Sequence, residues 1–264
     1  MKYAVMSDIH ANPTALARAV DDARKNGVDD FVCLGDFVGY GPSPNDAINL
    51  SRKVFGDRVV LGNHDAAIVR EMSMDSFSRR AQKSILAQRY MVDESNLDWL
   101  AARPHFIRER NLLFVHGDAS LDAGSIKAGF GYVFRPEDVS RVLSAVSDFG
   151  INIVFVGHTH EPMIWEMNGE GVVELLNENR IIASSSERFV VNVGTVGCPR
   201  SVHYASYAIV DIKEDGNVDI ELRKIPFDYS AYRDSLLEAG VDVPIWLEDR
   251  LSAPGSDKVE GFTM

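Results

Sequence analysis

The segment that most constrains the architecture is Lys2-Tyr3-Ala4-Val5-Met6-Ser7-Asp8-Ile9-His10. Residues 3–6 favour a short strand, and an aspartate and a histidine follow almost immediately. A second segment repeats the arrangement, because the apolar run 152–156 leads directly into Gly157-His158-Thr159-His160. Polar residues just beyond the carboxyl ends of strands are typical of the ligand-binding edge of an α/β sheet. The two segments therefore predict that the ends of several strands converge on one polar edge of a single sheet.

Short strand-forming runs alternate with amphipathic helical segments along the first two thirds of the chain. Residues 16–23 and 139–146 repeat apolar side chains at helical spacing, and the first of these patterns follows Asn12, a predicted cap, and Pro13. Later residues predict hairpins instead. The remaining expected elements are strands at 3–6, 30–34, 58–61, 112–115, 152–156 and 189–193, helices within 76–90 and 94–101, and hairpins pairing 163–167 with 172–176 and 204–211 with 217–223.

This order of elements predicts the domain organisation. Strand–helix units followed by hairpins suggest two packed sheets with helices outside them. No internal repeat or linker interrupts the pattern, so we expect a single domain over residues 1–251. The polar, glycine-containing segment 252–264 is expected to form a flexible C-terminal tail.

The composition limits the partners that the chain can bind. The 264 residues include 27 Lys and Arg against 39 Asp and Glu, a formal net charge of −12. Basic residues supply most of the affinity for nucleic acid, so no long nucleic acid is expected, whereas a small anionic substrate is compatible with this charge. No apolar run is long enough to predict a membrane span. Cys33 and Cys198 form no CxxC pair and are expected to be reduced thiols of a cytoplasmic protein. Nothing in the sequence predicts an oligomeric state.

Five of the seven histidines follow an expected strand, or a glycine-containing turn after one, in the company of Asp or Asn. Imidazole nitrogens combined with carboxylate and amide oxygens suit Mn, Fe, Zn or Ni better than calcium. Each segment alone has an ordinary alternative; in the third, Asn63 or Asp65 could simply cap a helix. All of them in this order favour a metal centre. They are Asp8-Ile9-His10, Gly35-Asp36, Gly62-Asn63-His64-Asp65, His116-Gly117 and Gly157-His158-Thr159-His160.

These segments resemble the motifs of the calcineurin-like metallophosphoesterases, which are D-x-H, G-D, G-N-H-[DE], H and G-H-x-H. Residues 192–197 and Tyr40-Gly41-Pro42 are similar to the small prokaryotic phosphodiesterase and phosphatase branch, although Thr195 stands where that branch has serine. The resemblance implies an α/β fold, a four-layer α/β/β/α sandwich of two mixed β-sheets flanked by helices. It also implies a site with two metal ions.

The resemblance further implies a role for each motif residue. His64 would be catalytic, touching the scissile phosphate and assisting departure of the leaving oxygen. Asp36 would bridge the two metals. The implied ligands are Asp8, His10, Asp36 and His160 for one metal, and Asp36, Asn63, His116 and His158 for the other.

The implied activity is that of a dinuclear metal-dependent phosphoesterase, a hydrolase of phosphodiesters or phosphomonoesters of small molecules. The nucleophile would be a hydroxide that bridges two divalent ions of Mn, Fe, Zn or Ni, with Mn favoured. After charge neutralisation by Asp8 and Asp36, about two positive charges would remain to bind a phosphate. The alternatives are a nuclease of the same superfamily, disfavoured by the net charge, and a metal-binding regulatory protein without turnover.

One departure from the superfamily narrows the substrate. Its protein Ser/Thr phosphatases carry G-D-x-V-D-R-G, and here Gly39 and Tyr40 replace the second Asp and the Arg. A phosphoprotein phosphatase of that kind is therefore not expected. Arg200 and Tyr40 are the candidate substrate-binding residues. The aromatic segment 130–134 either closes over the cleft or packs beneath it.

Overall fold

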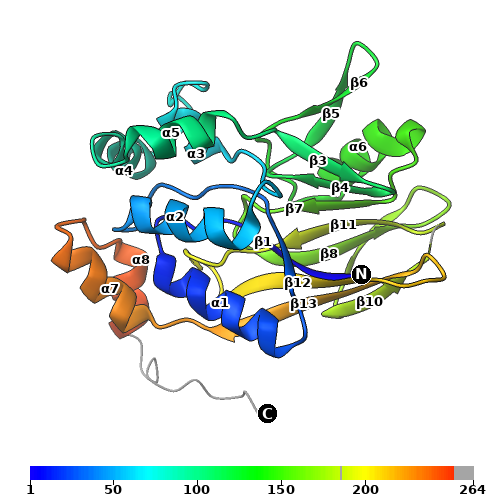
Figure 1. The fold of residues 1–264 in the computed structure, drawn as a ribbon. Coiled ribbons are helices and arrows are strands. Elements are labelled where there is room, and N and C mark those ends of the chain that lie inside the picture. The colour runs from blue at the N-terminus through cyan, green and yellow to red at the C-terminus, as the bar shows by residue number, and fades with distance from the viewer. Residues whose placement is uncertain (185, 253–264) are drawn as a thin grey trace.

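In the computed structural model, which describes residues 1–184 and 186–252, two large mixed β-sheets pack face to face (Figure 1). The first sheet has the strand order β10-β13-β12-β1-β2, and the second has the order β3-β4-β7-β11-β8-β9. A separate ribbon, β5-β6, extends near the second sheet. The strands are β1 (Lys2–Met6), β2 (Asp30–Cys33), β3 (Phe106–Glu109), β4 (Leu112–Val115), β5 (Ala119–Asp122), β6 (Ser125–Ala128), β7 (Ile153–Val156), β8 (Pro162–Met167), β9 (Val173–Leu176), β10 (Arg180–Ala183), β11 (Arg188–Val193), β12 (Tyr204–Ile212) and β13 (Val218–Pro226).

Strand β1 illustrates how the sequence builds the layers. Successive side chains of a strand point to opposite faces of the sheet. Tyr3 and Val5 belong to the core between the two sheets, whereas Ala4 and Met6 belong to the core between the first sheet and its helices. All four side chains are fully buried. The predicted strand is therefore correct, and it is a central strand, parallel to β2 and antiparallel to β12.

Helices cover the outer face of each sheet. Helices α1 and α2 pack on the first sheet, and α6 packs on the second (Figure 1). Asn12 caps α1 as predicted, because its Oδ1 accepts a hydrogen bond from the backbone N of Ala15 at 3.0 Å. The four-layer α/β/β/α arrangement is thus confirmed. The helices are α1 (Pro13–Lys25), α2 (Pro44–Phe55), α3 (Asn63–Ile68), α4 (Arg79–Arg89), α5 (Glu94–Ala101), α6 (Pro136–Val146), the 3-10 turn η1 (Ser147–Phe149), α7 (Tyr229–Glu238) and α8 (Ile245–Ser252).

The expected strand at 58–61 is wrong in extent. Only one bridge forms there, between Val59 and Cys33 at the end of β2. The two segments then approach each other closely at Gly35 and Gly62. A Cβ on Gly35 would lie 2.4 Å from the backbone N of Gly62. Glycine permits such a close approach of two backbones, and it lies just beyond the point where the pairing with β2 ends. The segment therefore becomes a loop that leads into α3.

Other boundaries also differ from the prediction. The helix expected at 76–90 begins at Arg79, because the Ser78 side chain accepts a hydrogen bond from the backbone N of Ala81 and ends the preceding loop. Both predicted hairpins form, as β8–β9 and β12–β13. Ser252 ends α8, and the rest of the expected tail, 253–264, lies outside the described residues. Within the described ranges, no helix is both long and apolar enough to cross a membrane.

Candidate active site

The polar residues predicted to converge lie where the carboxyl ends of strands from both sheets meet. The loops after β1 and β2 come from the first sheet, and the loops after β4 and β7 come from the second. The start of α3 adds Asn63 and His64. The expectation that they line one edge of a single sheet is therefore wrong, since the site lies at the junction of the two sheets.

The first cluster consists of Asp8, His10 and His160, and all three side chains are almost completely buried. The His160 Nε2 lies 3.1 Å from Asp8 Oδ1 and 3.0 Å from His10 Nε2. The Nδ1 atoms of both rings contact backbone carbonyls, at 2.9 Å for His10 with Val38 and 2.6 Å for His160 with Cys198.

These contacts define what the first cluster can bind. When Nδ1 of a neutral imidazole donates to a carbonyl, Nε2 carries the free lone pair. The two Nε2 lone pairs then face each other next to the Asp8 Oδ1, which has no hydrogen-bond donor among the described residues. Facing acceptors repel unless a cation lies between them, and a carbonyl-oriented imidazole is the usual arrangement of a metal-bound histidine. The donor set therefore fits a divalent metal ion.

The second cluster consists of Asp36, His116 and His158, with the amide of Asn63 beside them. His116 Nε2 lies 3.4 Å from Asp36 Oδ2, 3.2 Å from His158 Nδ1 and 3.0 Å from Asn63 Oδ1. The Nδ1 of His116 contacts the backbone carbonyl of Leu34 at 2.8 Å. These nitrogen and oxygen atoms also suit a divalent transition metal.

Asp36 lies between the two clusters. Its Oδ2 is 3.7 Å from His10 Nε2 in the first cluster, besides its contact with His116 in the second. Its Oδ1 accepts a hydrogen bond from the backbone N of His64 at 2.9 Å. One carboxylate is therefore within reach of both candidate metal positions.

The pKa values follow from burial and from this density of charge. Burial opposes protonation of His116, but the Asp36 carboxylate outweighs it and raises the pKa of His116 to about 9. Burial lowers the pKa of His158 to about 3 and that of His160 to about 4. Although burial alone would raise it, the neighbouring histidines hold the pKa of Asp36 below its usual value. Asp36 is thus ionised and His158 and His160 are neutral, the forms that bind metals, whereas His116 has to lose a proton to bind one.

The backbone at the site is strained. Asp8, His10, Asp36, His158 and His160 all have φ between +46° and +67°. Side-chain-bearing residues adopt this left-handed region rarely, and such strain concentrates at functional sites. Asp8 and His10 therefore do not lie on an extended segment. They converge because the chain turns sharply after β1.

Asp65 has a structural role that the sequence suggested only in part. Its carboxylate accepts hydrogen bonds from the backbone N atoms of Gly62 at 3.1 Å, Asp36 at 2.7 Å and Phe37 at 2.9 Å. The expected capping of α3 is real, but the same carboxylate also holds the loop that presents Asp36. Burial and the Asp36 charge raise the pKa of Asp65 to about 7. The motif residue after His64 therefore shapes the site without contacting the candidate metal positions.

A cavity of about 260 Å³ opens over these groups. His64, Tyr40 and Arg200 line it, together with candidate ligands of both clusters, so the predicted substrate-binding residues do reach the site. The Arg200 guanidinium lies 5.6 Å from the Tyr40 ring centre. Burial raises the pKa of Tyr40 to about 12 and lowers that of His64. A nitrogen of His64 also lies within 4.8 Å of ligand atoms of His10 and Asp36, so the geometry permits it to bind a metal as well.

The aromatic segment 130–134 borders the cavity. The Tyr132 ring stacks on His158 with centroids 4.1 Å apart and planes 12° from parallel, and Phe130 also lines the opening. Phe134 is exposed and does not line it. Tyr132 thus packs on a candidate ligand at the border of the cleft, and closure of the segment over the cleft stays a prediction. Cys198 is a buried free thiol, and its carbonyl, not its sulfur, contacts His160.

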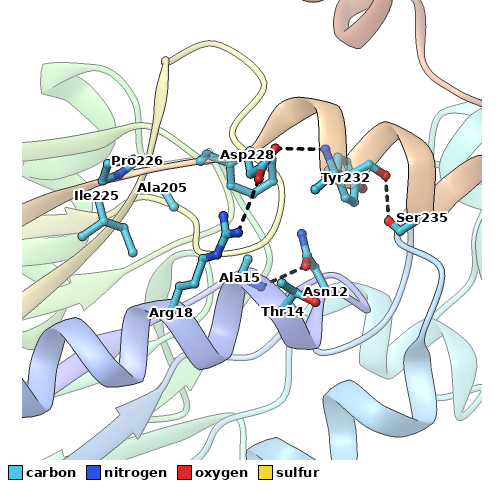
Figure 2. A pocket seen from close by; sticks show the side chains of 12 residues that line it. Asn12, Thr14, Ala15, Arg18, Ala205, Ile225, Pro226, Asp228, Tyr232 and Ser235 are labelled. Atoms are coloured by element: carbon cyan, nitrogen blue, oxygen red, sulfur yellow. Dashed lines mark hydrogen bonds and ion pairs between the residues drawn. The ribbon is translucent and has the colours of Figure 1, made fainter. Parts of the chain in front are cut away.

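A second cavity, of about 80 Å³, lies between α1 and α7 (Figure 2). Arg18 and Asp228 form an ion pair there at 3.4 Å, and Asp228 also accepts a hydrogen bond from the backbone N of Ala231 at 2.9 Å (Figure 2). Asn12 is used as the cap of α1. These polar groups are thus satisfied by helix ends, and none of them belongs to a metal-ligand cluster. The cavity over His64 is therefore the candidate active site.

Adjacent Asp–His clusters thus lie at the common end of two packed sheets. The chain belongs to the calcineurin-like phosphoesterase superfamily, whose domain matches residues 1–215. Membership of this metal-dependent family makes the protein a hydrolase of phosphoric esters. It is 31% identical over 253 residues to the uncharacterized protein MJ0912 of Methanocaldococcus jannaschii, an alignment that covers 94% of this chain and 96% of that protein.

Two solved structures share the fold. The metallophosphoesterase from Sphaerobacter thermophilus superposes with a TM-score of 0.76 at 28% identity, covering 96% of this chain and 98% of that one. The hypothetical protein PH1004 from Pyrococcus horikoshii OT3 superposes with a TM-score of 0.68 at 16% identity, covering 95% and 97% of the two chains. The second likeness supports the fold alone. The family assignment made from the sequence motifs is confirmed.

Proposed function

We propose that the protein is a dinuclear metallophosphoesterase of small phosphorylated molecules. The observation that carries this proposal is the position of Asp36, one of whose oxygens faces histidines of both clusters. Asp8, His10, Asp36 and His160 would hold one divalent ion, and Asp36, Asn63, His116 and His158 the other. Mn²⁺ is the first choice because the ligands are nitrogens and oxygens without a thiolate.

When bound, the two ions would supply Lewis-acid activation of a water molecule and neutralise charge on the phosphate oxygens. The protein supplies the remaining functions. His64 lines the cavity beside the clusters and would contact the phosphate as charge builds on the leaving oxygen. The Arg200 guanidinium would hold a non-bridging oxygen of the ester, and Tyr40 would form the wall against which that arginine rests.

The substrate is proposed to be a phosphodiester or phosphomonoester of a small molecule. The cavity of about 260 Å³ lies just below the roughly 300–1,000 Å³ of typical small-molecule sites, which favours a compact ligand. The net charge of −12 counts against long nucleic acids as substrates. Among the described residues of the cavity lining, Arg200 is the one Lys or Arg side chain, enough to complement one phosphate group.

A substrate panel tests the proposal. The metal-free protein is loaded with Mn²⁺, Fe²⁺, Zn²⁺ or Ni²⁺ and assayed with bis-p-nitrophenyl phosphate and p-nitrophenyl phosphate, while metal content is measured by mass spectrometry. The proposal expects two ions per chain and turnover of at least one ester. Two ions without turnover would support the metal-binding regulatory alternative. Turnover confined to single-stranded DNA would support the nuclease alternative.

A further inference from the structure

His64 is buried, but no polar contact orients its ring within the described residues. Its side chain is 4% exposed. The ring Nδ1 has no hydrogen-bond partner among the residues that the structure describes. This sets it apart from the three candidate metal-binding rings that contact backbone carbonyls through Nδ1. Something other than a hydrogen bond therefore determines where the His64 ring lies.

Packing provides that constraint. The ring centre of His64 lies 4.8 Å from that of Tyr40, 5.2 Å from that of Phe77 and 4.9 Å from that of His10. His10 and Phe77 meet the imidazole at 75° and 71°, the edge-to-face geometry that aromatic pairs prefer, and Tyr40 is tilted from it by 56°. Three aromatic neighbours thus confine the imidazole on these sides.

The Gly39 backbone borders the His64 ring on another side. A Cβ added there would lie 2.2 Å from Nδ1 of His64, 2.9 Å from Cε1 and 3.1 Å from Cγ, and these are the three nearest atoms. The imidazole therefore occupies the space that any side chain at position 39 would need. The φ of +86° at Gly39 also brings the backbone into a conformation that glycine adopts most readily.

Gln88 fixes the backbone of this glycine against α4. Its Oε1 accepts a hydrogen bond from the backbone N of Gly39 at 2.6 Å, and its Nε2 donates to the carbonyl of Gly41 at 2.7 Å. Gln88 is 4% exposed, so these bonds are shielded from water. Phe77 lies just before the same helix. Helix α4 thus connects the glycine and the aromatic wall on either side of His64.

We propose that Gly39 is a positioning residue for His64. Because position 39 carries no side chain, the imidazole can lie against its backbone, where it reaches the phosphoester. Together, Gly39, Tyr40 and Phe77 form the site that holds the ring, which we call the His64 seat. The inference rests on the proposed function, because it assigns His64 a contact with the substrate. It implies that filling the seat impairs turnover through displacement of His64 and leaves the metal clusters loaded.

The first test is Gly39→Ala, with Gly56→Ala as its matched control. Gly56 also has a positive φ, of +57°, but a Cβ there meets nothing within 4 Å. Both variants impose a strained backbone, and only the first collides with His64. We expect Gly39→Ala to lower kcat by about 100-fold, the lower range for loss of a general acid–base group, with two metal ions retained. Gly56→Ala should leave kcat unchanged. Equal losses in the two variants would overturn the proposal.

A double-mutant cycle separates an effect through His64 from any other effect. In the His64→Ala background the collision no longer exists, so Gly39→Ala should change kcat by less than about twofold. If the two losses multiply instead, Gly39 acts elsewhere and the proposal is wrong. Should Gly39→Ala fail to fold, Phe77→Ala is taken through the same cycle, because it opens the seat from the opposite side. A loss of kcat that persists without His64 would again contradict the proposal.

A readout without turnover separates this inference from the proposed function. NMR of the imidazole Cε1–Hε1 groups in protein loaded with diamagnetic Zn²⁺ should show the His64 signal displaced in Gly39→Ala but not in Gly56→Ala, with the signal assigned through His64→Ala. An unmoved signal would overturn the positioning role. If the parent protein hydrolyses no ester while the signal moves as expected, the proposed function fails and the seat of His64 stands.

Discussion

The two candidate metal clusters differ in how their histidines are held. In the first cluster, both His10 and His160 are fixed by buried contacts of Nδ1 with backbone carbonyls. In the second, only His116 has such a contact. The Nδ1 of His158 instead faces His116, and its ring rests on Tyr132, a side chain that is 58% exposed.

This difference predicts unequal metal sites. Partners that orient a ligand typically change metal affinity by about 10–100-fold. Both histidines of the first cluster are oriented through main-chain carbonyls of loops that follow strands. The second depends in part on one exposed aromatic ring from the segment beyond β6. We therefore expect the first site to bind its ion more tightly, and the following predictions test that ranking.

The largest effect is expected at the residue shared by both clusters. Asp36→Asn removes the charge that faces His10 and His116. A neutral amide cannot replace a carboxylate between two divalent ions. Losing several kcal/mol of transition-state stabilisation would lower kcat/KM by more than about 1000-fold. Metal content should fall below two ions per chain by mass spectrometry.

The control for this variant is Asp57→Asn, at a side chain that is 97% exposed and forms an ion pair with Arg103. It should retain both ions and full activity. If Asp36→Asn kept two tightly bound ions and the parent rate, Asp36 would not connect the clusters. The comparison between them would then concern two independent sites.

The convergence of these residues was predictable from the sequence because strand periodicity and polar strand ends are local signals. The runs 112–115 and 152–156 became β4 and β7 with boundaries within one residue of the prediction. The sharing of the site between two sheets was not predictable, since sheet membership depends on pairing between distant strands. The left-handed backbone of Asp8 and His10 is likewise imposed by the tertiary contacts of their loop.

The second prediction concerns the ring that supports His158. Tyr132→Ala removes the stacking partner, so we expect about 10-fold weaker binding of one Mn²⁺ ion and an unchanged affinity for the other, measured by isothermal titration calorimetry. Tyr132→Phe retains the ring and should retain both affinities. Weakening of both ions to the same degree would show that Tyr132 does not act on the second cluster alone.

The stacking of Tyr132 on His158 could not be predicted from the sequence. The aromatic segment 130–134 was recognised, yet a lid and a packing role were both open, because loop paths do not follow from periodicity. The same holds for Gly39. Its substitution for an aspartate of the protein phosphatases was visible, but the close approach of His64 became apparent only with the ring in place.

The third prediction concerns Thr195, which supports the first cluster without being one of its candidate ligands. The Thr195 hydroxyl donates to the carbonyl of Asp8 at 2.9 Å and accepts a hydrogen bond from the backbone N of Cys198 at 3.0 Å, and the Cys198 carbonyl contacts His160. Thr195→Val removes both bonds with little change of shape. A net contribution of about 1 kcal/mol from these hydrogen bonds corresponds to roughly fivefold weaker binding of the tighter ion, which calorimetry would measure. Thr195→Ser keeps the hydroxyl and should behave as the parent. Selective loss of the weaker ion would reverse our ranking of the sites.

The smallest effect is expected at His105, which tests how far the support of the second cluster extends. Its ring lies 6.0 Å from Phe130 and within 2.6 Å of Glu71, and both members of this pair are substantially exposed. Exposed pairs contribute little to stability, so His105→Ala should change kcat, KM and both Mn²⁺ affinities by less than about twofold. A tenfold loss confined to the weaker ion would contradict this expectation. It would mean that His105 holds Phe130, and that the aromatic segment as a whole, instead of Tyr132 alone, orients the second cluster.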